Sequence, residues 1–94
     1  MKILALDIGT VRIGIATSDI MEIIASAYEV YRRKFLKADV SHVAEIVKNL
    51  EVGEVVIGLP LNMDGTEGPR VEVTREFGNA LKEASGLDII YVDA

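Results

Sequence analysis

An aspartate stands near the start of the sequence inside an otherwise apolar run. The residues from Ile3 to Ile8 are aliphatic apart from Asp7, and Gly9 follows this run directly. Burying a lone carboxylate costs several kcal/mol unless a positive group meets it, so we interpret Asp7 as part of a site. The alternative is that Asp7 only stabilises the following turn through its side chain. The spacing by itself leaves both interpretations open.

The residues on either side of Asp7 predict two strands. The apolar runs 3–8 and 13–16 are separated by a short turn, which is the pattern of a β-hairpin. Because side chains alternate across a strand, Asp7 shares one face with Ile3 and Ala5. Both faces are mostly apolar, which favours a central strand covered on two sides. Asp7 then lies at the carboxyl end of that strand, where open α/β sheets bind ligands.

The next part of the sequence predicts a strand, a helix and another strand. A segment rich in β-branched and aromatic residues predicts a strand over about residues 24–31. Asp39 or Ser41 is placed to cap the helix that follows. A nearly continuous apolar run over residues 54–60 then predicts a buried parallel strand. The helix is expected to bury a stripe of apolar residues, namely Val40, Val43, Ile46, Val47 and Leu50.

The last part predicts a loop, a second helix and a closing strand. Residues 61–68 have the composition of a loop, Pro69 is suited to open a helix, and Gly86 is suited to end it. Residues 88–93 form the last strand. The second helix is expected to bury Val73, Phe77, Ala80, Leu81 and Ala84.

The order of elements is βββαβαβ, and it predicts an α/β fold with one covered sheet face. Two right-handed crossovers that move in the same direction across a sheet leave both helices on one side. The other face would then expose Ile3 and Ala5 together with Ile90 and Val92. A monomer is not expected to leave such an apolar surface to water.

Composition limits the classes of function. The sequence has 94 residues with 10 basic and 15 acidic side chains, and we expect a single domain over residues 1–94. The acidic balance argues against non-specific nucleic-acid binding. The absence of cysteine excludes thiolate chemistry, so carboxylates must hold any metal. No apolar run approaches the roughly 20 residues that span a bilayer, and the sequence opens on a strand without a leader. We therefore expect a cytoplasmic protein with no membrane partner.

Three other features of the sequence carry weaker signals. The basic residues 32–34, with Lys37, lie among aromatic side chains and could contact nucleic acid, but a solvated strand end explains them better. His42 lies off the apolar stripe of its helix, and we interpret it as a surface residue outside the site. The amino end of the helix that Pro69 opens either receives a phosphate or is an ordinary helix start.

Three segments of the sequence carry a family resemblance. They are Asp7-Ile-Gly-Thr-Val-Arg-Ile-Gly-Ile-Ala, Val56-Ile-Gly-Leu-Pro-Leu-Asn-Met-Asp-Gly-Thr-Glu-Gly-Pro69 and Tyr91-Val-Asp93. Together they resemble the YqgF (RuvX) family, a branch of the RNase H-like fold related to Holliday junction resolvases. The resemblance runs over the whole chain and implies a mixed five-stranded sheet of order 3-2-1-4-5. It also implies a nuclease that matures the 5′ end of pre-16S rRNA, or that resolves Holliday junctions, with an rRNA precursor or branched DNA as partner.

The resemblance also implies roles for particular residues. Asp7 matches the first catalytic aspartate of the family, which holds Mg²⁺ or Mn²⁺ for phosphodiester hydrolysis. In the family the closing strand continues Asp-Glu-Arg, and a third acidic residue follows on a final helix. Here Asp93 is followed by Ala94, so two acidic ligands and the final helix are missing, and we expect weak metal binding and little nuclease activity. Thr10 and Arg12 are expected to contact the substrate, although Arg12 could instead neutralise nearby carboxylates. Asn62, Asp64 and Thr66 either orient the substrate or only shape the turn of their loop.

The sequence is also compatible with two other functions and with self-association. The same fold could serve as a non-catalytic module that binds RNA or a protein. The first motif is also similar to the phosphate loop of actin-like proteins and sugar kinases, although those proteins close a nucleotide between two such domains. Since the missing helix would have covered the bare sheet face, we expect a homodimer or higher oligomer through that face or through the edge of the last strand.

Overall fold

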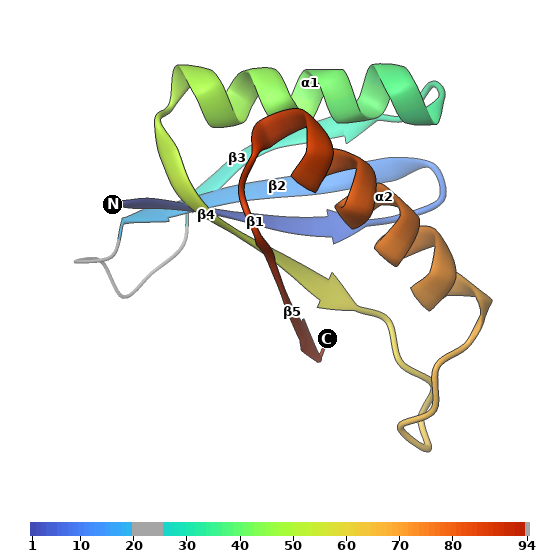
Figure 1. Cartoon of the computed structure of the whole chain (residues 1–94). Helices are drawn as coiled ribbons and strands as arrows, with labels where there is room; N and C mark the ends of the chain where they lie inside the picture. Colours follow the sequence, from blue (N-terminus) through green and yellow to red (C-terminus); the bar gives the residue numbers. More distant parts are fainter. Residues whose placement is uncertain (20–25, 94) are drawn as a thin grey trace.

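The computed structural model describes residues 1–19 and 26–93, and its sheet has the order that the resemblance implies. The elements are β1 (Lys2–Ile8), β2 (Arg12–Asp19), β3 (Ser26–Arg32), α1 (Leu36–Asn49), β4 (Val52–Leu59), α2 (Pro69–Ser85) and β5 (Ile89–Asp93). The strand order is β3-β2-β1-β4-β5 (Figure 1). The β1–β2 and β2–β3 pairs are antiparallel, while β4 runs parallel to both β1 and β5. The third strand ends one residue later than predicted, and positions 24 and 25 lie outside the described residues.

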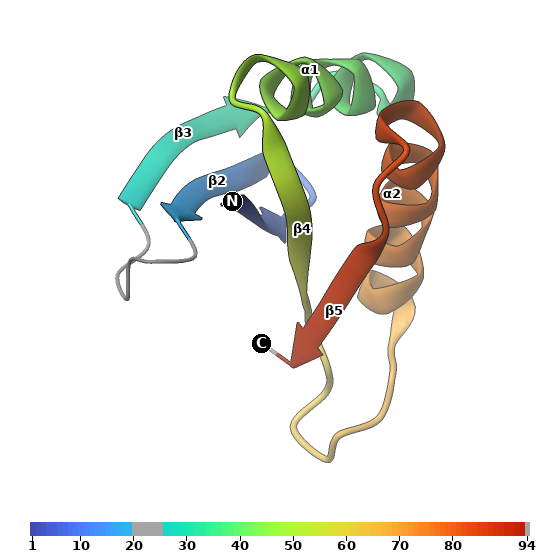
Figure 2. The same ribbon diagram turned by 60° about the vertical axis from the view of Figure 1, so that its left-hand side comes forward.

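Both helices cover the same face of the sheet. Figure 2 shows α1 and α2 on one side of the strands, with the opposite side open. On β1, Leu4, Leu6 and Ile8 are buried beneath the helices. They pack with side chains from β4 and α2, such as Ile57 and Phe77, in a single core. The alternation of side chains in the first strand therefore predicts correctly which of its residues form the core.

The opposite face of the sheet is uncovered in the described part of the chain. On this open face Ile90 and Val92 of β5 are 42% and 45% exposed, and Val30 of β3 is 69% exposed. The expectation of a bare face is confirmed for Ile90 and Val92, whereas Ile3 and Ala5 on β1 are only partly exposed. Within the described residues, the prediction that β1 is covered on two sides is wrong, because both crossovers turn the same way and bring both helices to one face.

The start of α1 differs from the prediction. The helix begins at Leu36, and its N-cap residue Phe35 makes no side-chain cap. Neither Asp39 nor Ser41 is the cap, because Asp39 is already inside the first turn. Its carboxylate turns back and accepts a hydrogen bond from the backbone N–H of Lys34, with the N and O atoms 2.9 Å apart.

Helix α2 has the predicted ends but a shifted buried face. Pro69 is its first residue, and Gly86 ends it in the left-handed conformation with φ of 77°. Phe77 and Leu81 are buried as expected, but Val73 is 44% exposed. The remaining buried positions are Val71, Thr74 and Gly78. The face that meets the sheet is therefore less apolar than the stripe that periodicity selects.

Candidate functional site

Asp7 lies at the carboxyl end of the central strand β1, on the open face of the sheet. Its side chain is exposed, and among the described residues no hydrogen bond or ion pair reaches its carboxylate. The prediction that this carboxylate is buried among apolar neighbours is therefore wrong for this part of the chain. The physical reason is that no element among residues 1–19 and 26–93 covers the face from which it projects, so water solvates it.

A shallow hollow of about 350 Å³ surrounds Asp7 on the open face. Gly14 of β2 lies directly opposite Asp7, and a Cβ at Gly14 would stand 3.6 Å from the Cβ of Asp7. The absence of a side chain there leaves room beside the carboxylate. The hollow is mostly apolar, and its lining residues are Ala5, Leu6, Asp7, Gly14, Ile15, Ala16, Ala27, Glu29 and Val30.

The turn that follows Asp7 is tightly held. The N–H of Gly9 donates to the carbonyl of Arg12 across the turn, with the N and O atoms 2.9 Å apart. A Cβ at Gly9 would come 2.6 Å from that carbonyl oxygen, so only glycine fits here without a backbone shift. Two arginines from distant segments also reach this turn. Arg33 Nη1 donates to the Gly9 carbonyl over 3.0 Å, and Arg70 Nη2 donates to the Ile8 carbonyl over 3.3 Å.

Arg33 has a structural role that the sequence did not reveal. Its Nε donates to Oδ2 of Asp39 over 2.9 Å, and its guanidinium lies 5.7 Å from the centre of the Phe77 ring. The middle residue of the basic segment 32–34 is thus engaged inside the protein. A signal was present, namely an arginine at the end of a strand and an aspartate in the first turn of the next helix, but only the tertiary structure shows that they meet.

The polar residues of the loop after β4 contact one another. Oδ1 of Asp64 accepts hydrogen bonds from the N–H and the hydroxyl of Thr66, over 3.0 Å and 2.6 Å, and the Asn62 amide donates to the same hydroxyl over 3.1 Å. The Thr66 hydroxyl and N–H hold the pKa of the Asp64 carboxyl below its usual value. All three side chains are exposed. No hydrogen bond of the described chain links them to β1, and their mutual contacts hold the loop in shape.

His42 is more enclosed than the sequence suggests. Its ring stacks on Tyr31, with the centroids 4.2 Å apart, and its Nε2 lies 3.1 Å from a carboxylate oxygen of Glu29. The histidine lies on α1 and both partners lie on β3, on the covered face of the sheet. His42 therefore joins this helix to an edge strand, and it is not brought near Asp7.

The described residues do not fit a divalent metal centre by themselves. Residues 1–19 and 26–93 contain no group of three or more acidic or histidine side chains that could hold an ion, and hard divalent cations need several oxygen ligands. Asp93 does not supply one beside Asp7. It pairs with Leu59, which is buried on the covered face, so Asp93 projects to the side opposite Asp7. Position 94 lies outside the described residues.

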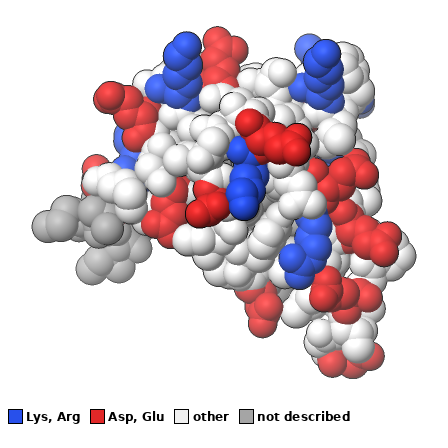
Figure 3. Space-filling model, in the orientation of Figure 1, with Lys and Arg blue, Asp and Glu red and all other residues white. Residues whose placement is uncertain are grey.

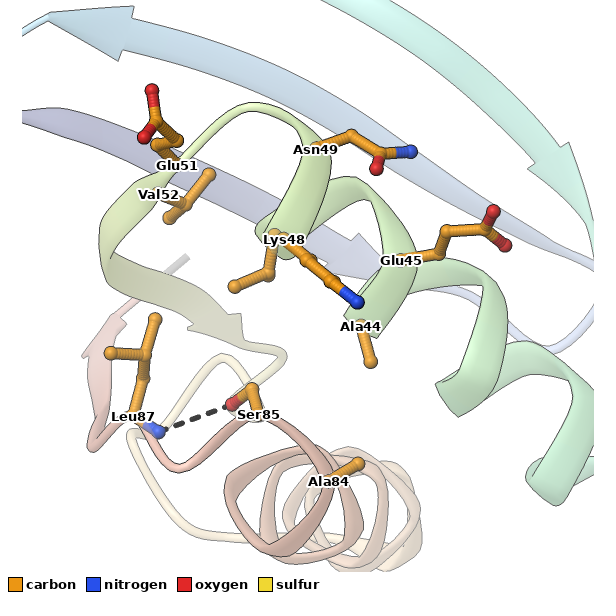
Figure 4. A pocket seen from close by; sticks show the side chains of 10 residues that line it. Ala44, Glu45, Lys48, Asn49, Glu51, Val52, Ala84, Ser85 and Leu87 are labelled. Carbon is orange, nitrogen blue, oxygen red and sulfur yellow. Dashed lines mark hydrogen bonds between the residues drawn. The ribbon is translucent and has the colours of Figure 1, made fainter.

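A second hollow, of about 680 Å³, lies at the other end of the sheet. It is formed where both helices end, close to the starts of β4 and β5, and Figure 4 shows the side chains around it. The N–H of Leu87 donates to Ser85 Oγ over 3.2 Å at its edge. It contains no residue of the three motifs, and it is far from the carboxyl ends of the strands.

The side of the protein seen in Figure 3 carries interspersed basic and acidic side chains. On this view the described residues form no continuous basic surface. In the described part of the chain, neither helix is long and apolar enough to cross a membrane.

Comparison with known proteins identifies relatives along the full length of the chain. The family model described as RuvX, Holliday junction resolvase, matches residues 1–94. A protein of Syntrophomonas wolfei is 44% identical over 93 residues, covering 99% of this chain and 66% of the relative. One of Fusobacterium nucleatum is 48% identical over 93 residues, covering 98% and 67%. Both carry the provisional name pre-16S rRNA nuclease. The chain thus spans about two thirds of the length of these relatives.

Solved structures agree on the fold. Thermus thermophilus RuvC superposes with a TM-score of 0.71 at 14% identity, covering 99% of this chain and 64% of that one. A hexokinase of the ROK type from the same organism superposes less well, with a TM-score of 0.56 at 17% identity, covering 99% and 34%. At such identities the likeness shows the fold alone, which is the RNase H-like fold of RuvC. The family match over residues 1–94 and the identities above show that the chain belongs to the RuvX family.

Proposed function

We propose that this chain carries part of the active site of a metal-dependent nuclease that hydrolyses phosphodiester bonds in structured nucleic acid. The observation that supports this most directly is Asp7, an unpaired carboxylate at the carboxyl end of the central strand with a glycine opposite it. This is the edge of an α/β sheet at which ligands bind. The names of the relatives point to the precursor of 16S rRNA as the substrate, and the family description points to branched DNA.

In this proposal Asp7 is the catalytic carboxylate and a ligand of Mg²⁺ or Mn²⁺. Because the described residues contain no group of three or more acidic or histidine side chains that could hold an ion, they would hold such an ion weakly and the chain alone would cleave slowly. Arg12 and Thr10 are exposed beside this carboxylate and are proposed to contact the substrate. We propose the same role for Asn62, Asp64 and Thr66, which are exposed on the loop that leaves the carboxyl end of β4.

A cleavage assay with protein in excess tests the proposal. The probes are an RNA that spans the 5′ end of 16S rRNA within its precursor and a four-way DNA junction, each with Mg²⁺ or Mn²⁺. We expect slow, metal-dependent cleavage of one probe that Asp7→Asn reduces to background. The matched control is Asp88→Asn, which removes an exposed carboxylate that precedes β5 at the opposite end of the sheet. The absence of Asp7-dependent cleavage of both probes would refute the nuclease proposal for this chain.

Metal binding has a separate readout. Mn²⁺ broadens the NMR signals of amides close to its site, so we expect titration to broaden the signal of Gly14, which pairs with Asp7. The Asp7→Asn variant should abolish this selective broadening. Equal broadening in both proteins would show that Asp7 does not hold the ion.

A non-catalytic module that binds RNA or a protein is the second candidate function. The isolated carboxylate favours it, since the described residues contain no complete set of metal ligands. Binding of the RNA probe without Asp7-dependent cleavage would support this function. The actin-like and sugar-kinase alternative has weaker support, because the hexokinase superposes less well than RuvC. It predicts that ATP raises the melting temperature, whereas the nuclease proposal does not.

We also propose that the chain associates with itself. The open face exposes apolar side chains on both edge strands, including Val30 on β3 and Ile90 and Val92 on β5. A second copy that covers this face, or that pairs along the free edge of β5, would remove them from water.

A further inference from the structure

Two arginines stand directly opposite each other on neighbouring strands. Arg12, the first residue of β2, pairs with Arg32, the last residue of β3. The N–H of Arg33 donates to the carbonyl of Val11 over 2.8 Å, so this hydrogen bond joins the residues just outside the arginine pair. In an antiparallel sheet that pattern marks a non-hydrogen-bonded pair, in which the two Cα atoms are only about 4.5 Å apart. The two side chains therefore start as close together as a sheet allows.

Both arginines project from the open face, on the side of Asp7. The next pair along these strands is Ile13 with Tyr31, and Ile13 is buried beneath the helices. Because side chains alternate, Arg12 and Arg32 project the other way. Gly14, two residues after Arg12, is the partner of Asp7. The arginine pair therefore lies on the same face as Asp7, and along the strands it is the next pair on that face after the one formed by Asp7 and Gly14.

The charges of this pair are not compensated within the described chain. Like charges directly opposite each other destabilise a sheet. Arg33, Arg70 and Arg75 each have a hydrogen-bond partner. Among the described residues no hydrogen bond or ion pair reaches the side chain of Arg12 or Arg32, and both are exposed. The free protein thus carries an electrostatic cost that a bound anion would remove.

We propose that Arg12 and Arg32 together bind a backbone phosphate of a nucleic acid and hold it beside Asp7. Guanidinium groups bind phosphate oxygens through paired hydrogen bonds. If both arginines bind the same phosphate, its negative charge explains why two like charges lie opposite each other. The proposal rests on the proposed function for the reaction at Asp7, while the phosphate site itself requires only binding. It assigns a role to Arg32, which lies outside all three motifs.

Binding without cleavage tests this proposal. The probe is a fluorescent RNA hairpin, and its anisotropy reports binding. EDTA removes divalent metal so that no cleavage occurs, and Asp7 is left unchanged. The variants are Arg12→Gln and Arg32→Gln. The matched control is Lys48→Gln, which removes the same charge from the exposed last turn of α1. We expect each arginine variant to weaken binding roughly tenfold and to lower the slope of log affinity against log salt by about one. The control should change the affinity less than twofold.

Thermal unfolding without RNA separates a binding role from a structural one. Removing one charge of a repelling pair should raise the melting temperature by about 1 to 5 °C, so affinity and stability should change in opposite directions. A fall in both would show that the arginines are structural and would refute the proposal. Inorganic phosphate at millimolar concentration should raise the melting temperature less than the RNA hairpin does. An equal rise would show that the site binds a free anion, and this result would also refute the proposal.

The outcomes distinguish this proposal from the proposed function. If both arginine variants bind the hairpin like the unmodified protein while Asp7-dependent cleavage is present, the phosphate site is refuted and the nuclease proposal stands. If binding is lost as expected while Asp7→Asn changes no cleavage, the phosphate site is supported and the nuclease proposal fails.

Discussion

Arg33 and Asp39 form an ion pair that is almost completely removed from water. Their Nε and Oδ2 atoms are 2.9 Å apart, and the side chains are 14% and 1% exposed. The second carboxylate oxygen of Asp39 accepts the Lys34 N–H, and a second nitrogen of Arg33 reaches the carbonyl of Gly9. This pair therefore connects the end of β3, the first turn of α1 and the turn that follows Asp7.

Replacing Asp39 with alanine should strongly destabilise the fold. The change leaves the Arg33 guanidinium without its anion in a largely buried position, and breaking such a pair typically costs about 3 to 5 kcal/mol. Urea unfolding at neutral pH measures this cost. Asp88→Ala is the control, because Asp88 is 89% exposed in its ion pair with Lys82 and such pairs contribute at most about 1 kcal/mol. Equal losses in the two variants would contradict the structural role of Asp39.

The same carboxylate predicts a pH dependence of stability. Burial raises the pKa of Asp39, but the N–H of Lys34 and the guanidinium of Arg33 donate to the carboxylate and hold its pKa below the ordinary value. A group whose pKa is lower in the folded state stabilises the fold above its unfolded pKa, which is about 3.9 for aspartate. That contribution is lost as the pH falls below this value and through the folded pKa. Urea unfolding between neutral and acidic pH should therefore show a steeper loss for the unmodified protein than for Asp39→Ala.

Arg33→Lys tests whether the turn after Asp7 depends on the guanidinium. Lysine keeps the charge for Asp39, but it cannot also hold the Gly9 carbonyl in the same geometry. We expect a loss of about 1.5 to 3 kcal/mol, the usual contribution of a hydrogen bond to a charged group, and faster hydrogen exchange of the Gly9 amide. Arg75→Lys is the control, because Arg75 pairs with Glu67 at the surface. Unchanged exchange at Gly9 would show that the arginine does not hold this turn.

The sequence predicts the arrangement of the strands better than it predicts the surroundings of Asp7. The alternation along β1 is a local property, and it correctly separates the face of Asp7 from the face of Leu4, Leu6 and Ile8, which the structure buries. Whether Asp7 is buried depends on what covers the opposite face of the sheet, which no local pattern states. The exposure of Asp7 therefore became clear only from the structure, although its place at the carboxyl end of the strand is as predicted.

Helix α2 shows the same limit. Hydrophobic periodicity selects Val73 for the buried stripe, but the structure buries Thr74 and Gly78 instead. Gly78 is buried because the ring of Tyr91 from β5 occupies the space where its side chain would be, and that contact joins two elements through a tertiary interaction. Likewise, the pairing of Arg12 with Arg32 depends on the register between β2 and β3, which composition does not fix.

Gly78→Ala should loosen the packing of β5 against α2. An added Cβ would overlap the hydroxyl of Tyr91, and overpacking of this kind costs about 1 to 3 kcal/mol, more than alanine gains through helix propensity. Thermal unfolding measures the effect, with the exposed change Asn79→Ala as control. Because the Tyr91 hydroxyl is buried and has no hydrogen-bond partner in the described chain, Tyr91→Phe should partly restore the stability of the Gly78 variant. A stabilised Gly78→Ala protein would contradict this packing.

Polar substitution on β5 tests the proposed self-association. Ile90 and Val92 project from the open face and are nearly half exposed, so their burial against a second copy would provide the driving force. We expect sedimentation velocity at tens of micromolar to show dimers or larger species, and Ile90→Thr with Val92→Thr to shift the protein to monomer. Threonine keeps the β-branched shape that suits a strand, so the fold should be retained.

Val73→Thr is the control, because Val73 is equally exposed but lies on helix α2, away from the open face. If the control dissociates the oligomer and the β5 variant does not, the interface lies on the helical side of the sheet. If the unmodified protein is a monomer at all concentrations, the open face stays in contact with water and the self-association proposal is refuted.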